Sequence, residues 1–324
     1  FRGVMGGAVT ATTGAIGGAH VAHKTGQNVV KGALSGGWTG ATKGYNAAKK
    51  GNMVGVVTAG VDTYAASKKK YGYDFDKQYE KDLAAMEKHL PAGKTAKNAA
   101  IAAADANNKK AIKDEFNRTG RNVNGYEVNY ANLIGDAEAE GIYKKYVATV
   151  AENSAIPGIS EEGLKVYNNA AQRKMYSALS EMQSSRANSA FQQKYSAFLQ
   201  KDTVGKEQDL AELFNAENAR RSAAGERIYS DWKSMYASIG NIDPTTISMD
   251  DAIKVALDQE IMVKTGHTTS EWSNIAGKDK GDASSASDEI KRHESSSKGK
   301  ADKRNKDLYS AAKGKVEAQG YKNS

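Results

Sequence analysis

The sequence contains no cysteine, only three prolines and few large aromatic residues other than tyrosine. The absence of cysteine excludes disulfides, thiolate nucleophiles and thiolate metal sites. Pro91, Pro157 and Pro244 leave long stretches without a residue that interrupts a helix. Six Phe and three Trp stand against 16 Tyr, and the mean hydropathy is −0.65. This composition suits long helices packed in bundles or in a shared oligomer better than one thick core.

Strand patterns are also scarce. No run of β-branched residues alternates with polar ones over a useful length, and we interpret Asn124–Gly125 as a turn between helices. We therefore predict an all-α fold, with long helices in an extended bundle or oligomeric tube, a glycine-zipper segment before them and a disordered basic tail after them. The predicted regions are a basic, membrane-competent packing segment (1–70), a helical region (71–156), a long-helix bundle (157–265) and a polar flexible tail (266–324).

Acidic residues are absent from the first 61 positions. The first 70 residues carry a net charge of +8, residues 71–276 sum to −4 and residues 277–324 to +4. A basic head and tail around a mildly acidic body favour contact with nucleic acid, an anionic membrane surface or an acidic partner. The head lysines that we expect to contact a membrane or nucleic acid are Lys24, Lys31, Lys43, Lys49, Lys50, Lys68, Lys69 and Lys70.

The acid-free segment also holds 15 of the 32 glycines, many of them four residues apart. Residues four apart share one face of a helix, so such a row forms a smooth strip where a second backbone approaches closely. Each Gly costs a helix in water about 0.5–1 kcal/mol relative to Ala, so this segment needs partner helices or lipid. The glycines that we expect to pack are Gly14, Gly18, Gly32, Gly36, Gly40, Gly44, Gly51 and Gly55.

Residues 3–23 contain no Lys, Arg, Asp or Glu, and this length is enough to span a hydrocarbon core of about 30 Å. Threonines, His20 and glycines make the stretch only moderately apolar, so we interpret it as inserting within an oligomer and not alone. The competing interpretation is that residues 1–61 form a flexible arm. Regular spacing of four disfavours the arm, because a linker has no reason to keep register.

Helical periodicity dominates the rest of the chain. We predict helices at 74–90, 95–117, 126–156, 160–200 with Ser160 as N-cap, 206–239, and 252–264 opened by a capping box at Ser248. The predicted apolar stripe of the 160–200 helix is Leu164, Tyr167, Ala171, Met175, Leu179 and Met182, resumed by Phe191, Tyr195 and Phe198. In the 206–239 helix the predicted inward residues are Leu210, Leu213, Ile228, Trp232 and Met235.

No motif indicates catalysis or metal binding. Gly93–Lys94–Thr95 lacks both the preceding strand and the earlier glycine of a phosphate loop, since Lys88 occupies that position. His20 and His23 lie three apart, but no third ligand follows nearby. We predict that the chain is not an enzyme and binds no metal or cofactor. The remaining histidines, which we expect in solvent near helix ends or in the tail, are His89, His267 and His293.

In these features the chain resembles the internal virion, or ejection, proteins of short-tailed bacteriophages. The resemblance lies in composition and architecture: the glycine rows 14–18 and 32–44, the cysteine-free helix at 164–200 and the basic tail. It implies a virion protein that is stored inside the capsid, ejected with the genome, and reassembled into a channel for DNA translocation across the host cell envelope. The implied partners are further copies of the chain as a homo-oligomer, virion core, portal and tail proteins, the host membrane and genomic DNA. A first residue other than Met fits proteolytic maturation.

Two other functions stay open. A secreted, bacteriocin-like pore-forming toxin would use the same N-terminal segment without a virion. A soluble nucleic-acid-associated packing protein would instead place its basic head and tail on phosphates, and steep salt dependence without lipid binding would favour it. Lys68–Lys70, with Tyr71 and Tyr73 beside them, fit phosphates with base stacking as well as anionic head groups.

Overall fold

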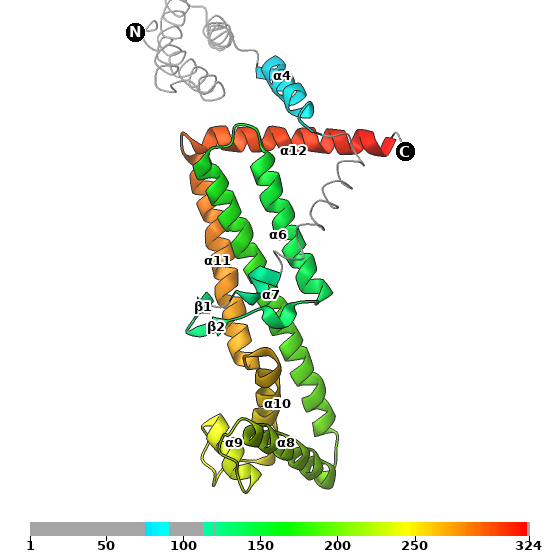
Figure 1. Ribbon diagram of the computed structural model, residues 1–324, viewed down its shortest axis with the longest axis vertical. Coiled ribbons are helices and arrows are strands. Elements are labelled where there is room, and N and C mark those ends of the chain that lie inside the picture. Colours follow the sequence, from blue (N-terminus) through cyan, green and yellow to red (C-terminus); the bar gives the residue numbers. More distant parts are fainter. Residues whose placement is uncertain (1–74, 91–112, 119–120, 323–324) are drawn as a thin grey trace, which may run out of the picture. The chain divides into compact units, whose positions relative to one another are not determined.

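The computed structural model describes residues 75–90, 113–118 and 121–322, which are mainly helical (Figure 1). The predicted all-α character is confirmed for these residues, apart from one short β-hairpin. Contacts divide the chain into two units, residues 98–300 and a unit that combines 1–97 with 301–324.

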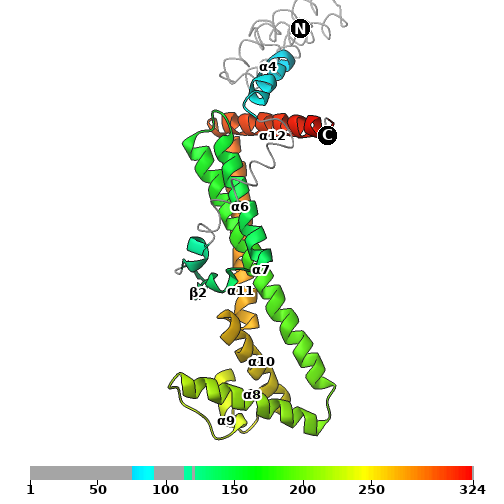
Figure 2. The same ribbon diagram turned by 45° about the vertical axis from the view of Figure 1, so that its right-hand side comes forward.

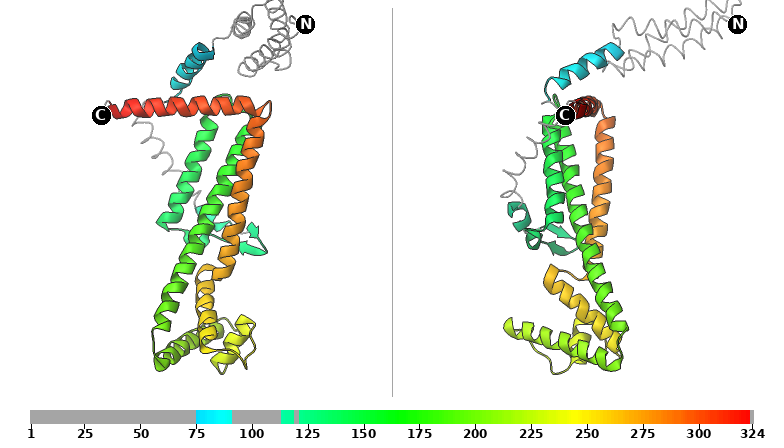
Figure 3. Two further views of the ribbon diagram at one scale, coloured as in Figure 1. Left: turned by 180° about the vertical axis from the view of Figure 1, so that it is seen from behind. Right: turned by 90° about the vertical axis from the view of Figure 1, so that its right-hand side faces the viewer.

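Within the 98–300 unit, three long helices lie side by side. They are α6 (Ala137–Ala155), α7 (Glu161–Leu199) and α11 (Thr269–Ser295) (Figures 1 and 3). α7 has 39 residues, which gives a length of about 58 Å at the usual rise of an α-helix. The predicted long helix at 160–200 is confirmed.

Local signals explain where α7 begins and which face it buries. The Ser160 hydroxyl accepts a hydrogen bond from the Gly163 amide at 2.9 Å, and this satisfies one of the free amides of the first turn. Glu161 and Glu162 add negative charge where the helix dipole favours it. The predicted stripe is buried along the bundle at Tyr167, Ala171, Met175, Leu179 and Met182, while Leu164 is half-buried.

α11 runs antiparallel to α7. The hydroxyl oxygens of Ser184, in the middle of α7, and Ser273, near the start of α11, are 3.4 Å apart. The hydroxyl of Tyr167, near the start of α7, donates to Glu294 near the end of α11 at 3.1 Å. Trp272 is fully buried in the core that α7 and α11 share. The antiparallel arrangement places the helix dipoles in opposition, which is favourable for helices in contact.

The predicted polar flexible tail over 266–324 is wrong. Two helices, α11 and then α12 (Gly299–Lys322), occupy most of this range. Two features stabilise α11: a capping box in which Thr268 and Glu271 bond each other's backbone, and burial of a few widely spaced side chains against the bundle.

Three further helices gather around the C-terminal end of α7. They are α8 (Thr203–Ala223), α9 (Trp232–Gly240) and α10 (Met249–Thr265) (Figure 2). The predicted capping box at Ser248 is confirmed, with Asp251 as its partner. The fully buried apolar side chains of this cluster include Phe198, Leu210, Met235, Tyr236 and Ile253.

The prediction of one helix over 206–239 is wrong, because the chain turns between α8 and α9. The Ala224 amide closes α8 on the carbonyls of Arg220 and Arg221, and Gly225 follows with a φ of +70°. Glycine adopts this conformation without steric cost, so the helix ends here. Ile228, predicted to point inward, is 58 % exposed in the connecting loop.

The predicted helix over 126–156 begins too early. β1 (Arg121–Val123) pairs antiparallel with β2 (Tyr126–Val128), with Val123 opposite Tyr126. Asn124 and Gly125 connect the strands with φ values of +51° and +83°, the conformation of a type I′ hairpin turn. A single 3-10 turn, η1 (Ala131–Leu133), and the cap Asp136 then lead into α6.

In the other unit, α4 (Phe75–Glu87) packs against α12 through Leu83, Leu308 and Ala312. Two ion pairs flank this contact, Arg304 with Asp82 and Lys315 with Glu87. The predicted helix at 74–90 is confirmed. Its α-helical part ends at Glu87 and residues 88–90 form a turn, in keeping with the tendency of helices to end at or before the residue that precedes a proline.

Candidate functional site

The glycines and lysines predicted to pack helices or to contact a membrane or nucleic acid all lie in residues 1–70, outside the described residues. In the part of the chain that the structure describes, polar groups gather in a buried cluster around Arg121 and in an open pocket beside α9.

The buried cluster fastens the β-hairpin to the helical bundle. Arg121, the first residue of β1, donates hydrogen bonds of 2.9 and 3.0 Å to the two carboxylate oxygens of Asp279 in α11. Its guanidinium also donates to the Tyr130 hydroxyl and lies 3.9 Å from the centre of the Tyr176 ring. One arginine therefore contacts α7, α11 and the segment that follows the hairpin.

Burial makes this cluster structurally important. Asp279 is 2 % exposed, so its negative charge depends on the bidentate pair with Arg121. Burial also raises the pKa of the Tyr130 hydroxyl, which keeps the phenol neutral beside the ion pair. The Nε of Arg121 is buried and donates to no group among the described residues.

A second set of contacts ties residues 113–118 to α7. The Tyr176 hydroxyl donates to Glu115 and accepts from Arg118, both at 2.9 Å, and Phe116 is buried against Tyr143 of α6. Burial raises the pKa of Tyr176, and its hydrogen bond to Glu115 raises it further. The Tyr176 side chain therefore packs with its ring and forms hydrogen bonds with its hydroxyl.

The expectation that His267 and His293 lie in solvent is wrong. His267 is 9 % exposed, and its Nε2 lies 3.0 Å from the carbonyl oxygen of Glu127 in β2. Its ring also meets the edge of Trp272. His293 is 7 % exposed, with its ring against Tyr167. Both burials follow from α11, which was not predicted from the sequence. The two ends of this helix lie against β2 and α7.

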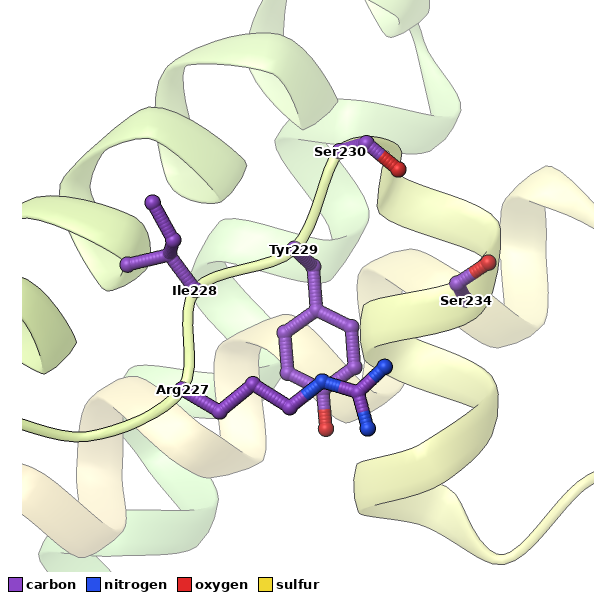
Figure 4. A pocket seen from close by; sticks show the side chains of 5 residues that line it. All are labelled: Arg227, Ile228, Tyr229, Ser230 and Ser234. Atoms are coloured by element: carbon purple, nitrogen blue, oxygen red, sulfur yellow. The ribbon is translucent and has the colours of Figure 1, made fainter.

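The pocket beside α9 lies between the α8–α9 loop and the first turn of α9, with a volume of about 410 Å³ (Figure 4). Arg227 extends along the Tyr229 ring, with its guanidinium carbon 5.2 Å from the ring centre, while Ile228 points away from both. Tyr229 is fixed by Asn218, which bonds both its amide and its carbonyl. Five residues line the pocket: Arg227, Ile228, Tyr229, Ser230 and Ser234.

The chemistry of this pocket is that of a helix cap. The hydroxyls of Ser230 and Ser234 donate to the same oxygen of Asp231 at 3.4 and 2.8 Å, and the Ser234 amide donates to the other oxygen. The bond from the Ser234 amide, followed by that from its hydroxyl, lowers the pKa of Asp231. No histidine lines the pocket, so no imidazole is placed to take a proton from either serine.

Two further findings concern the described residues only. They contain no group of three or more His, Asp or Glu side chains placed to hold a metal ion. None of their helices combines the length and the apolarity that crossing a membrane requires.

Comparison with known proteins gives no relative on which a function can rest. No family model matches the sequence, and neither the curated proteins nor the solved structures contain a significant match.

Proposed function

We propose that this chain is a structural virion protein that is ejected with the genome and assembles with copies of itself into part of a DNA conduit across the host envelope. The observation that carries the proposal is the row Gly32, Gly36, Gly40 and Gly44 within an acid-free segment of 61 residues. Such a segment forms a helix poorly in water, and its helix becomes favourable where neighbouring helices or lipid pack against it. The protein would thus occupy the virion interior first and the host envelope afterwards.

The described helices support this proposal as a scaffold. Ion pairs connect the helices of the bundle. Arg186 of α7 lies 2.5 Å from Asp136 at the start of α6, and Lys194 of α7 lies 2.5 Å from Glu260 of α10. Capped antiparallel helices of this length are rigid elements that pack side by side in oligomers. In the proposed conduit these helices are the part of each copy that supports its N-terminal segment within the oligomer.

Circular dichroism of the full chain tests the mechanism. We expect the helical signal to rise when anionic liposomes are added to the wild-type chain, and to rise less for the double variant Gly36→Leu/Gly40→Leu, whose bulky side chains block close approach of a second backbone. An unchanged signal in liposomes would contradict the proposal. Assembled particles that contain the protein in several copies distinguish a virion protein from a secreted toxin.

A further inference from the structure

The turn between α11 and α12 carries a dense positive charge. Residues 291–300 contain four cationic side chains and a single carboxylate, Glu294, which accepts a hydrogen bond from Tyr167 at 3.1 Å. Three of the cations form no ion pair with any described residue, and the fourth, Lys291, lies 3.0 Å from Asp288. All four are exposed: Lys291, Arg292, Lys298 and Lys300.

This turn has a defined backbone. The Ser296 hydroxyl accepts a hydrogen bond from the Gly299 amide at 3.0 Å, and the Ser296 amide donates to the carbonyl of His293 at 2.9 Å. A Cβ on Gly299 would lie 1.8 Å from the carbonyl oxygen of His293, so the first turn of α12 touches the last turn of α11. The cations therefore flank a defined turn, with Arg292 in the last turn of α11, Lys298 directly before α12 and Lys300 in the first turn of α12.

Helix stability does not explain two of these charges. Lys298 and Lys300 lie at the start of α12, where the helix dipole disfavours cations. The acid of this first turn, Asp302, is 1 % exposed, so its carboxylate is not at the surface beside them. Arg292 has a simpler explanation, because a cation in the last turn of α11 suits that helix. A locally unfavourable pair of lysines is the kind of departure that functional surfaces show.

We propose that this basic turn, Arg292 with Lys298 and Lys300, binds the phosphodiester backbone of nucleic acid. Lysine and arginine supply the attraction, and serine hydroxyls are common donors to phosphate oxygens. Ser295, Ser296 and Ser297 are exposed in the same turn.

A lipid surface fits the turn less well. Residues 291–300 contain no Leu, Ile, Val, Met, Phe or Trp, whereas interfacial binding needs apolar side chains to enter the bilayer. The choice of nucleic acid also rests on the proposed function, in which the protein travels with a genome.

The test is DNA binding of the full chain as a function of salt. Anisotropy of a fluorescent 20-base-pair duplex gives the slope of log K against log salt, and each phosphate contact contributes about −0.9 to it. Substituting Lys298→Gln/Lys300→Gln should make the slope shallower by about 1.8, two contacts of this size. Residues 1–70 are unchanged in all variants, so their contribution to binding cancels in the comparison.

Lys278→Gln/Lys280→Gln is the matched control, because it removes the same charge from the exposed middle of α11. Its slope should equal that of the wild type. An unchanged slope in Lys298→Gln/Lys300→Gln, or an equal change in the control, would overturn the inference. The inference would also be overturned if Lys298→Gln/Lys300→Gln lost binding to vesicles of anionic lipid but kept its DNA binding. The turn would then be a membrane contact.

Both double variants should keep the wild-type circular dichroism spectrum and melting temperature, since the substituted side chains are exposed. Failure of this DNA-binding test can be distinguished from failure of the proposed conduit function. The difference in salt slope between the variant and the wild type reports on the α11–α12 turn, whereas the conduit mechanism depends on Gly36 and Gly40.

Discussion

Arg121 in β1 and Asp279 in α11 are 158 residues apart in the chain, yet they form a bidentate ion pair with distances of 2.9 and 3.0 Å. The Asp279 side chain is 2 % exposed and that of Arg121 is 22 % exposed. This pair holds the β-hairpin on the bundle, with His267 making a second contact to the same hairpin at Glu127.

Removing one partner of this ion pair should destabilise the protein strongly. Asp279→Ala leaves the Arg121 charge uncompensated, and we expect a loss of about 3 kcal/mol in the free energy of unfolding, measured with urea. Asp282→Ala is the control on the same helix, because Asp282 is 47 % exposed and lies 3.6 Å from Lys278. Its effect should stay below about 1 kcal/mol. Equal effects of the two substitutions would contradict a supporting role for the buried pair.

The hairpin turn makes a prediction about Gly125. Gly125→Ala should destabilise the protein by about 1–2 kcal/mol, because a side chain disfavours the left-handed backbone, and the φ of Gly125 is +83°. No atom lies within 4 Å of the added Cβ, so the cost is conformational. Gly141→Ala, with equally open space inside α6, should instead stabilise by about 0.5–1 kcal/mol. The two unfolding midpoints should therefore move in opposite directions.

The turn between α11 and α12 makes a similar prediction about Gly299. Its added Cβ would lie 1.8 Å from the His293 carbonyl oxygen, so Gly299→Ala should lower stability by about 1–3 kcal/mol, the usual cost of overpacking. The control is Gly281→Ala in α11, where nothing lies within 4 Å, and it should be neutral or stabilising. Thermal unfolding followed by circular dichroism compares them. A Gly299→Ala variant as stable as Gly281→Ala would contradict the close contact between Gly299 and the His293 carbonyl.

Acid stability should depend on Arg186. Hydrogen bonding from Arg186, followed by the Ala139 amide, lowers the pKa of Asp136 from 3.8 to about 2. A carboxyl whose pKa is lower in the folded state contributes its stabilisation fully above its unfolded pKa, near pH 4, and loses it as pH falls towards 2. Arg186→Gln should therefore lower stability at pH 7 and shift acid unfolding to higher pH.

The control for this pH experiment is Arg173→Gln, because Arg173 lies 3.7 Å from the exposed Glu289. This substitution removes a surface arginine from the same helix without touching Asp136. Its unfolding curve between pH 2 and pH 7 should stay close to that of the wild type. If both variants shifted alike, a general loss of positive charge, and not the Asp136 pair, would be responsible.

Helices with local start signals and a complete apolar stripe were predictable from the sequence. α7 has the Ser160 cap and a stripe at steps of three and four, and α10 has the capping box of Ser248 and Asp251. These features act within one or two turns, so they can be identified without knowing what the helix packs against.

Elements whose stability comes from distant residues were not predictable. Each strand of the hairpin has three residues, too few for a recognisable alternation, and Asn124–Gly125 was its one local signal. α11 buries only a few residues in 27, so its Ser-, Gly- and Asp-rich sequence has the composition of a flexible tail. Its Thr268–Glu271 capping box was a usable signal that composition obscured.

The candidate site shows the same limit. The Arg121–Asp279 pair joins positions 158 residues apart, and neither sequence neighbourhood indicates a buried ion pair. The N-terminal glycine rows, in contrast, are plain in the sequence, and they lie outside the described residues.

The most direct test of the proposed function is the oligomeric state of the full chain in detergent micelles, measured by sedimentation. The comparison is between the wild type, Gly36→Leu/Gly40→Leu and Ser35→Leu/Thr42→Leu. On an α-helix the leucines of the last variant would lie about a third of a turn from the centre of the glycine row. The wild type and the second variant should sediment as oligomers, and Gly36→Leu/Gly40→Leu should be monomeric. Oligomers of wild-type size from Gly36→Leu/Gly40→Leu would contradict the claim that these segments pack through their glycine faces.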